Sequence, residues 1–250
     1  MSLSGKTIVI TGGCKNLGAL CATDLAQLGK PNFVLHYHSD SLKSDADKLV
    51  AELDSKYGSK AIAVQGNLED VKEITKLFET AKKEFGGVDI AINTVGMVLK
   101  KPIMELSEKE YDHMFDVNSK VAFFFIKEAG NHLNKGGKIC TIVTSLLAAF
   151  TGYYALYAGS KAPVEHFCRA AAKEFVDKGI SVTNVAPGPM DTPFFYGQES
   201  DEAVAFHKSQ SLNGKLTDIK DIAPIVRFLV TEGWWITGQT IFANGGYTTR

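Results

Sequence analysis

A tyrosine and a lysine four positions apart have side chains that could act together in proton transfer. In the segment YAGSK, the phenol of Tyr157 and the ammonium of Lys161 stand at positions i and i+4, so on a helix they share one face. A free phenol has a pKa of about 10 and is a poor acid or base at neutral pH. A neighbouring positive charge favours the phenolate, so we expect Lys161 to lower the pKa of Tyr157 towards the range of efficient acid–base catalysis. Taken alone, the same spacing also fits an exposed helix face.

Two further polar residues stand where they could join this pair. Ser145 ends an apolar, strand-like run over Lys138–Thr144, and ligands bind at the carboxyl ends of parallel strands. Asn118 lies in the middle of a helical pattern, where asparagine weakens a helix and needs a compensating interaction.

A glycine-rich segment near the start could bind a phosphate group. TGGCKNLG, residues 11–18, follows the apolar run Thr7–Thr11 and leads directly into an amphipathic pattern over Leu17–Leu28. Glycines let the backbone turn sharply and approach a pyrophosphate, and a helix N-terminus offers free N–H groups and a positive dipole. A simple turn between strand and helix is the alternative.

These motifs together resemble the short-chain dehydrogenase/reductase family from about residue 5 to residue 247. TGGCKNLG is similar to the family's TGxxxGxG fingerprint, with Asn16 in place of the middle glycine; asparagine tolerates a left-handed backbone better than most residues. The family's catalytic tetrad matches in order and approximate spacing, and it implies the catalytic residues Asn118, Ser145, Tyr157 and Lys161. The interval from Ser145 to Tyr157 is one residue shorter than is common, which leaves Thr144 as an alternative to Ser145.

The resemblance also implies which residues bind a nicotinamide dinucleotide. Asn67 would accept a bond from the adenine amino group, and Thr192 would lie near the nicotinamide carboxamide. Asn93 belongs to a variant of the family's NNAG turn and fits a role in bracing the sheet at least as well. The expected cofactor-binding residues are Gly12, Lys15, Asn16, Leu17, Tyr37, His38, Ser39, Asn67, Leu68, Asn93, Gly96, Tyr157, Lys161, Pro187, Gly188 and Thr192.

The end of the second strand-like run favours NADP(H) over NAD(H). An NAD site has a carboxylate there for the ribose 2′-hydroxyl, whereas this chain reads LHYHS over residues 35–39, a run that resembles NADP-dependent pteridine reductases of the same family. Lys15, His38 and Ser39 could bind a 2′-phosphate. Asp40 lies near the spacing of the NAD rule, so NAD(H) remains possible. A metal site on His36 and His38 lacks a nearby third ligand, and no metal is expected.

The substrate expected from the resemblance is a small molecule with a carbonyl or alcohol group. Apolar and aromatic residues in segments expected to border the nicotinamide would form its wall, namely Leu147, Phe150, Tyr153, Met190 and Phe194; the same side chains would equally suit the packing of a lid. The long stretch over about 191–215 has no strand pattern and suggests such a lid.

The predicted reaction is reduction of a small apolar or aromatic ketone or aldehyde by NADPH, with Tyr157 as proton donor. No clear basic cluster stands beside the expected lid, which ranks a 3-oxoacyl-carrier-protein reductase second. An NAD-dependent alcohol or polyol dehydrogenase keeps the same residues and reverses the direction. A non-enzymatic NADP sensor on the same fold has no need of Tyr157 and Lys161 and ranks last.

The pattern of elements that must position these residues is α/β. Short apolar runs alternate with helical patterns from end to end, which predicts a doubly wound, Rossmann-type parallel sheet of about seven strands with helices on both faces. No repeat or linker divides residues 1–250, so one domain is expected. The expected strands are Thr7–Thr11, Phe33–His36, Ala61–Val64, Val88–Asn93, Lys138–Thr144, Ser181–Ala186 and Thr240–Ala243; the expected helices are Leu17–Leu28, Leu42–Lys56, Val71–Phe85, Glu108–Leu133, Tyr154–Lys178 and Asp218–Val230.

Composition limits the possible partners. With a net charge of −1 and no basic block, a nucleic-acid partner is not expected. The longest apolar run, Val121–Ile126, is far short of the ~18 residues of a membrane span, and no secretory signal is visible. We therefore expect a cytoplasmic protein with no membrane contact and four free cysteines. The family resemblance implies a homotetramer or homodimer.

Overall fold

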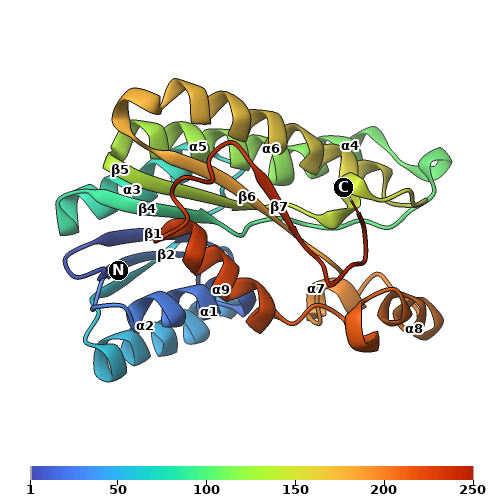
Figure 1. Ribbon diagram of the computed structural model, residues 1–250, viewed down its shortest axis with the longest axis horizontal. Coiled ribbons are helices and arrows are strands. Elements are labelled where there is room, and N and C mark those ends of the chain that lie inside the picture. The colour runs from blue at the N-terminus through green and yellow to red at the C-terminus, as the bar shows by residue number, and fades with distance from the viewer. Residues whose placement is uncertain (1, 250) are drawn as a thin grey trace.

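Seven short apolar segments form one parallel β-sheet in the structure, a computed structural model that describes residues 2–249. The sheet order is β3-β2-β1-β4-β5-β6-β7 (Figure 1). Each predicted strand is present, and the fold class is confirmed: a doubly wound α/β sheet whose order turns back at β1 and β4. The strands are β1 (Thr7–Thr11), β2 (Asn32–Tyr37), β3 (Ala61–Gln65), β4 (Val88–Asn93), β5 (Leu133–Ile142), β6 (Ser181–Pro187) and β7 (Thr240–Ala243).

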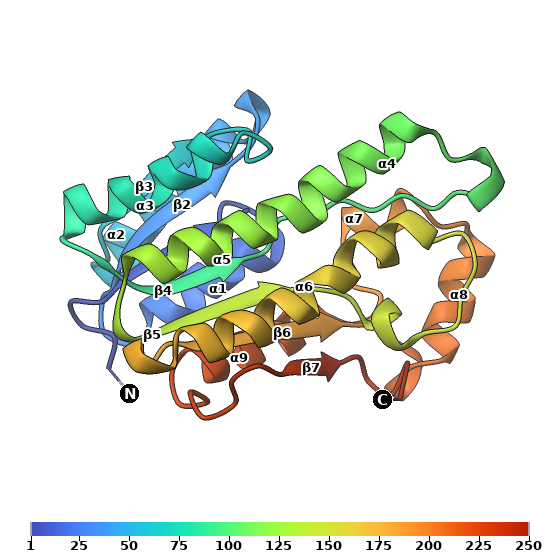
Figure 2. The ribbon, with the colours of Figure 1, turned by 90° about the horizontal axis from the view of Figure 1, so that it is seen from above.

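Helices cover both faces of this sheet. α1, α2 and α9 lie on one face and α3, α5 and α6 on the other (Figures 1 and 2). Each face has its own apolar core, because β1 has side chains buried on both sides. The helices are α1 (Asn16–Ala26), α2 (Lys43–Tyr57), α3 (Val71–Phe85), α4 (Glu108–Phe115), α5 (Val121–His132), α6 (Ala155–Glu174), α7 (Pro193–Tyr196), α8 (Asp201–Ser209) and α9 (Ile219–Val230).

The long helix expected over Glu108–Leu133 is interrupted. One π-helical turn, Asp116–Lys120, separates α4 from α5. Asn118 lies in this turn, is buried, and hydrogen-bonds to the backbone of Met97. Such π-helical turns are rare in proteins, and those that occur often lie at functional sites. The sequence predicts an interaction that compensates for an asparagine in the middle of a helix. In the structure, this compensation takes the form of a local change from α-helix to π-helix.

The segment 191–215 contains two helices that the sequence analysis did not predict. α8 has good end signals: the Ser200 side chain accepts a hydrogen bond from the Ala203 N–H, acidic residues fill the first turn, and His207 and Lys208 stand in the last. These features complement the helix dipole. The segment was missed because no residue of α8 is fully buried, which leaves no clear apolar period to recognise.

Two expectations drawn from composition concern free cysteines and membrane-spanning helices. All four cysteines are free and buried, and burial raises the pKa of Cys14 and Cys140 to about 12, so both are neutral thiols at pH 7. Within residues 2–249, no helix has the length and apolar character to cross a membrane.

Candidate active site

A large pocket opens at the carboxyl ends of β1, β2, β4 and β5. It encloses about 1810 Å³, its open mouth included. Most of the residues expected to bind a dinucleotide line it, together with the tyrosine and lysine of the YAGSK segment. The predicted residues in its lining are Gly12, Lys15, Asn16, Leu17, Tyr37, His38, Asn67, Leu68, Gly96, Tyr157, Lys161, Met190, Thr192 and Phe194.

The glycine-rich loop takes the sharp turn that its sequence predicts. Asn16 has φ of 47°, so asparagine does adopt the left-handed backbone where the fingerprint has glycine. Gly12 has φ of 63°, and a Cβ there would come within 2.7 Å of Thr94 Oγ1. No side chain caps the first turn of α1, so the first N–H groups of this helix are free to bind an anion at the pocket.

His36 holds this loop from behind, a role that sequence reasoning missed. Its Nδ1 accepts a hydrogen bond from the Gly12 N–H at 3.1 Å, and its Nε2 lies 2.9 Å from the Gly66 carbonyl oxygen, to which it donates. One imidazole thus links the loops after β1 and β3 in its neutral form. Burial lowers the pKa of His36 to about 4. Among the described residues, no group of three or more potential metal ligands occurs with His36 or elsewhere.

Acid should therefore weaken the protein through His36. The pKa of this side chain falls from 6.5 in the unfolded chain to about 4 in the folded one, so its contribution to stability is complete above pH 6.5 and is lost as the pH falls towards 4. The difference corresponds to roughly 3 kcal/mol. Unfolding by denaturant at pH 7 and pH 4.5 measures it. His36→Gln should have a smaller pH dependence, while His166→Gln, on the exposed side of α6, should behave as wild type. Equal pH dependence in all three proteins would contradict the assignment.

Four of the expected cofactor residues lie outside the lining of the large pocket. The Ser39 hydroxyl is bonded to that of Ser41. Asn93 braces the sheet, since its Oδ1 accepts bonds from the Thr11 hydroxyl and the Val95 N–H. Pro187 and Gly188 line a neighbouring small pocket instead.

Tyr157 and Lys161 both border the large pocket, as the i and i+4 spacing predicts. The Lys161 ammonium donates hydrogen bonds to the Ile142 carbonyl oxygen at 3.1 Å and to that of Val95 at 3.3 Å, which leaves one of its three donors. A Cβ on Gly96 would come within 2.7 Å of this ammonium, so glycine makes room for it. Burial lowers the pKa of Lys161 to about 8.

The pKa of Tyr157 differs from the sequence-based expectation. Burial raises it to about 12, and the interaction that opposes this rise is a side-chain hydrogen bond from Thr144, not the charge of Lys161. The raised pKa keeps the phenol protonated at neutral pH. This is the protonation state that a proton donor needs.

Thr144 and Ser145 have different partners. The Ser145 hydroxyl donates to the Ala186 carbonyl oxygen at 2.9 Å, and the residue is 1% exposed. The Thr144 hydroxyl accepts a hydrogen bond from the Leu146 N–H, and the Thr144 side chain opposes the rise in the pKa of Tyr157. Both residues line the small pocket together with Tyr157, but only Thr144 influences the pKa of the phenol.

Asn118 joins two segments at the rear of the site. Its Oδ1 accepts from the Met97 N–H at 2.9 Å, and its amide group donates to the Met97 carbonyl oxygen and the Ser160 hydroxyl. Both amide hydrogens are used, so this side chain holds the backbone after β4 against α6.

The small pocket lies beside Tyr157 and has about 630 Å³ of open space, its mouth included. Of the five expected substrate residues, Met190 and Phe194 line it. Leu147 packs into a core cluster with Val143, and Phe150 and Tyr153 are exposed; these three lie outside the lining. The sequence analysis missed Val98, Leu146, Tyr154, Gln198, His207 and Tyr247, which do line it.

Comparison with known proteins places this site in a family. A family model described as enoyl-(acyl carrier protein) reductase matches residues 12–248. The chain is 33% identical over 261 residues to an NADPH-dependent aldehyde reductase-like chloroplastic protein of Arabidopsis thaliana, covering 99% of this chain and 96% of the relative. It is also 33% identical over 266 residues to a hydroxynaphthalene reductase-like protein of Metarhizium anisopliae, covering 99% and 97%. A dehydrogenase from Burkholderia cenocepacia, solved with bound NADP, is 56% identical and superposes with a TM-score of 0.97 over 100% of this chain and 96% of the other.

The chain belongs to the short-chain dehydrogenase/reductase family. It is an NAD(P)-dependent oxidoreductase, as the resemblance of its motifs implied.

Proposed function

We propose that this protein uses NADPH to reduce a small, neutral, apolar or aromatic ketone or aldehyde to the alcohol, with Tyr157 as proton donor. The single observation that carries the proposal is that Tyr157 lines both pockets. A dinucleotide in the large pocket and a carbonyl compound in the small one would therefore meet at its phenol. Both pockets also share Val143, Met190 and Phe194, which make the meeting point apolar.

The residues present fit the nicotinamide end of a dinucleotide. Thr192 lines the large pocket and is 5% exposed, and its hydroxyl oxygen has no hydrogen-bond partner among the described residues. A buried hydroxyl without a partner is costly, and a carboxamide would supply one. The absence of a side chain at Gly96 makes room for the Lys161 ammonium in the large pocket, where its remaining donor could bind ribose hydroxyls.

We propose NADP(H) rather than NAD(H) as the cofactor. Lys15 in the glycine-rich loop and His38 at the end of β2 both line the large pocket, whereas Asp40 lies outside its lining and accepts a hydrogen bond from Gln65. A cation is thus available for a 2′-phosphate, and the nearby carboxylate is engaged elsewhere. The NADP in the Burkholderia dehydrogenase and the NADPH dependence in the name of the Arabidopsis relative support the same choice.

Lys15→Ala should weaken NADPH binding about tenfold or more and leave NADH binding nearly unchanged, because it removes a charge that only the 2′-phosphate uses. Titration of protein fluorescence with each cofactor measures both affinities. Lys48→Ala, an exposed lysine of α2 outside the pocket, serves as the control. Unchanged NADPH affinity in Lys15→Ala would contradict this assignment.

Each polar side chain has a task in the proposed reaction. Bound NADPH supplies a hydride to the carbonyl carbon. Tyr157 donates its proton to the carbonyl oxygen, and the Thr144 hydroxyl stabilises the phenolate that this leaves. Lys161 would hold the ribose hydroxyls with its remaining donor, and Asn118 keeps the backbone beside it in place.

The lining of the small pocket supports the proposed substrate class. Its wall is mostly apolar, with Val98, Leu146, Pro189 and Phe195 among its members. No lysine or arginine stands among the described residues that line this pocket, and Lys100, whose backbone bonds with the lining residue Gln198, is paired with Glu199. The names of the aldehyde reductase-like and hydroxynaphthalene reductase-like relatives agree with a neutral carbonyl compound.

Reduction of a 3-oxoacyl group on a carrier protein is the second candidate. The matching family model is described as an enoyl-(acyl carrier protein) reductase, which acts on the same kind of carrier-bound acyl group but reduces a C=C bond. The test is the loss of NADPH absorbance with three substrate sets: aromatic aldehydes and ketones, aliphatic ketones, and acetoacetyl-carrier protein. Oxidation of alcohols and polyols with NAD⁺ completes the assay. Preference for neutral carbonyl compounds supports the proposal. Preference for the carrier-protein substrate or for NAD⁺ oxidation, or NADPH binding with no turnover of any set, overturns it.

We further propose that the protein acts in the cytoplasm as a homodimer or homotetramer, with residues 191–215 as a lid on a single domain. Phe228, Trp234 and Trp235 are 45%, 53% and 81% exposed near the edge strand β7. Exposed apolar groups of this size gain free energy when a partner covers them. Light scattering on the purified chain tests the assembly, and a monomer would refute it.

A further inference from the structure

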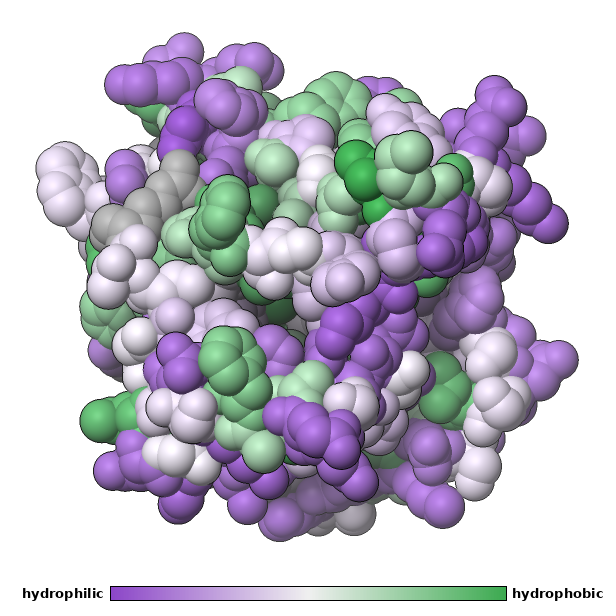
Figure 3. Space-filling model, turned by 90° about the vertical axis from the view of Figure 1, so that its right-hand side faces the viewer, coloured by the Kyte–Doolittle hydropathy of each residue, from purple (hydrophilic) through white to green (hydrophobic). Residues whose placement is uncertain are grey.

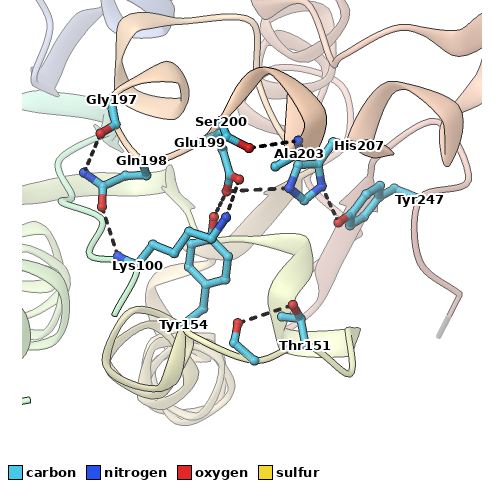
Figure 4. Close-up of polar contacts among 11 residues, drawn as sticks. Lys100, Thr151, Tyr154, Gly197, Gln198, Glu199, Ser200, Ala203, His207 and Tyr247 are labelled. Carbon is cyan, nitrogen blue, oxygen red and sulfur yellow. Dashed lines mark hydrogen bonds and ion pairs between the residues drawn. The ribbon is translucent and has the colours of Figure 1, made fainter. Parts of the chain in front are cut away.

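Glu199, in the segment 191–215, is a completely buried carboxylate beside the small pocket. Its side chain is 0% exposed. Its Oε2 accepts a 2.5 Å hydrogen bond from the Lys100 ammonium, and its Oε1 accepts one from the Tyr154 hydroxyl. His207 Nε2 lies 3.5 Å from the same Oε1. Figure 4 shows the carboxylate in the middle of these three donors.

These donors come from separate parts of the fold. Lys100 follows β4, Tyr154 immediately precedes α6, and His207 stands on α8. A second link lies alongside, since the Lys100 N–H donates to Gln198 Oε1 at 2.9 Å. We name Lys100, Tyr154, Glu199 and His207 the clamp, because these side chains join the segment 191–215 to the body of the protein.

The clamp adjoins the small pocket: some of its side chains line the pocket, and the others lie behind these. Tyr154, Gln198 and His207 line that pocket, and Lys100 and Glu199 do not. The His207 ring also meets the hydroxyl of Tyr247, another lining residue, at 2.8 Å. The Tyr154 ring lies 6.2 Å from the Tyr157 ring. The buried charges therefore set the position of the wall that faces the reacting phenol. Figure 3 shows the side of the molecule on which α7 and α8 lie. A hollow on this side is bordered by both hydrophobic and hydrophilic side chains.

A carboxylate buried to this degree depends on its partners. Desolvation of a charge costs several kcal/mol, and removal of one partner from a buried pair leaves the other charge uncompensated. If either Lys100 or the Glu199 carboxylate is removed, the remaining charge has no partner that offsets its desolvation. Residues 191–215 then lose the interaction that holds them in their present position. The segment has few other buried anchors, since α7 and α8 have no fully buried residue.

We propose that Glu199 is a positioning residue that, through Lys100 and Tyr154, fixes the segment 191–215 as the wall of the substrate pocket. It does not touch the reacting atoms. This inference rests on the proposed function, because it assigns the small pocket to the substrate. Loss of the clamp should weaken substrate binding strongly and cofactor binding much less, because only Thr192, Pro193 and Phe194 of this segment line the cofactor pocket.

The experiment compares two adjacent lysines. Lys100→Met removes the cation of the clamp, and Glu199→Gln removes the charge while keeping the shape of the side chain. Lys101→Met is the matched control, since Lys101 pairs with Glu110 at 2.8 Å, away from residues 191–215. Lys100→Arg restores a cation. For each variant we would measure KM and kcat for the preferred carbonyl compound, NADPH affinity, and the rate of proteolysis within residues 191–215.

Lys100→Met and Glu199→Gln should each raise KM about tenfold or more, with kcat within about threefold. NADPH affinity should fall by much less, because most of the cofactor pocket lies outside residues 191–215. Lys101→Met should match wild type, and Lys100→Arg should recover most of the loss. The double variant should be less impaired than the two single effects combined, because neither charge is then left alone.

Unchanged KM and unchanged proteolysis in both single variants would overturn the inference, and so would a loss confined to kcat. Proteolysis keeps the test separate from the proposed function. If wild type reduces no carbonyl compound, the proposed function fails, while faster cleavage of residues 191–215 in Lys100→Met, but not in Lys101→Met, would still establish the clamp.

Discussion

Replacement of Tyr157 by phenylalanine should lower kcat for carbonyl reduction by about 10²–10⁴-fold, the usual contribution of a positioned acid. The ring remains to fill the junction of the two pockets, so the fold and NADPH affinity should stay near those of wild type. What is lost is the hydroxyl that donates the proton and that bonds with Thr144. Single-turnover absorbance at 340 nm, at saturating NADPH, measures the chemical step.

Tyr111→Phe provides the matched control, since Tyr111 is 48% exposed on α4 and lines neither pocket. It should retain full activity. Tyr157→Phe with activity within tenfold of wild type would remove Tyr157 from the role of acid. A pKa raised to about 12 by burial adds a second expectation: across pH 6–9, Tyr157 stays protonated and should cause no fall in the rate of reduction.

Thr144→Val should cost about 10²-fold in kcat, whereas Ser145→Ala should cost far less. Valine keeps the shape of threonine and removes the hydroxyl that opposes the rise in the pKa of Tyr157. A hydrogen-bond donor lost at the position where negative charge develops typically costs 10²–10³-fold. Ser145 bonds instead with the Ala186 carbonyl oxygen, so its loss should appear mainly as roughly 1 kcal/mol of stability.

Thr144→Ser retains a hydroxyl and should preserve activity, which separates chemistry from packing. Steady-state kinetics and thermal unfolding of the three variants together decide between the two residues. A large loss of kcat in Ser145→Ala, with Thr144→Val near wild type, would return the role to Ser145, the residue that the family pattern implied.

Local patterns were sufficient to predict the sheet and the cofactor loop. A buried strand such as β1 is visible as an apolar run, and Asn16 could be assigned a left-handed backbone from its residue type and place. The distinction between Thr144 and Ser145 was not accessible in this way, because both hydroxyls lie at the small pocket with Tyr157. Their different partners become visible only in the folded chain.

Contacts between distant segments were the least predictable part. The sequence analysis considered His36 as a metal ligand. Its hydrogen bond with the Gly12 N–H depends on the pairing of β1 with β2, which brings the two residues together. Glu199 meets Lys100 across 99 positions and Tyr154 across 45. No hydrophobic periodicity in the sequence marks Lys100 or Tyr154 as a partner of Glu199. Charged residues in loops are ordinarily expected to face solvent. Residues 191–215 were therefore predicted as a long loop, and their buried carboxylate was missed.

The reach of Glu199 has a consequence for attempts to alter substrate range by exchanging loops between relatives. A transplanted stretch that carries Glu199 into a recipient lacking the lysine after β4 and the tyrosine before α6 would bury a carboxylate without the donors that compensate its charge. The natural module for such an exchange is discontinuous. It consists of the loop together with two single positions far upstream, moved as one set.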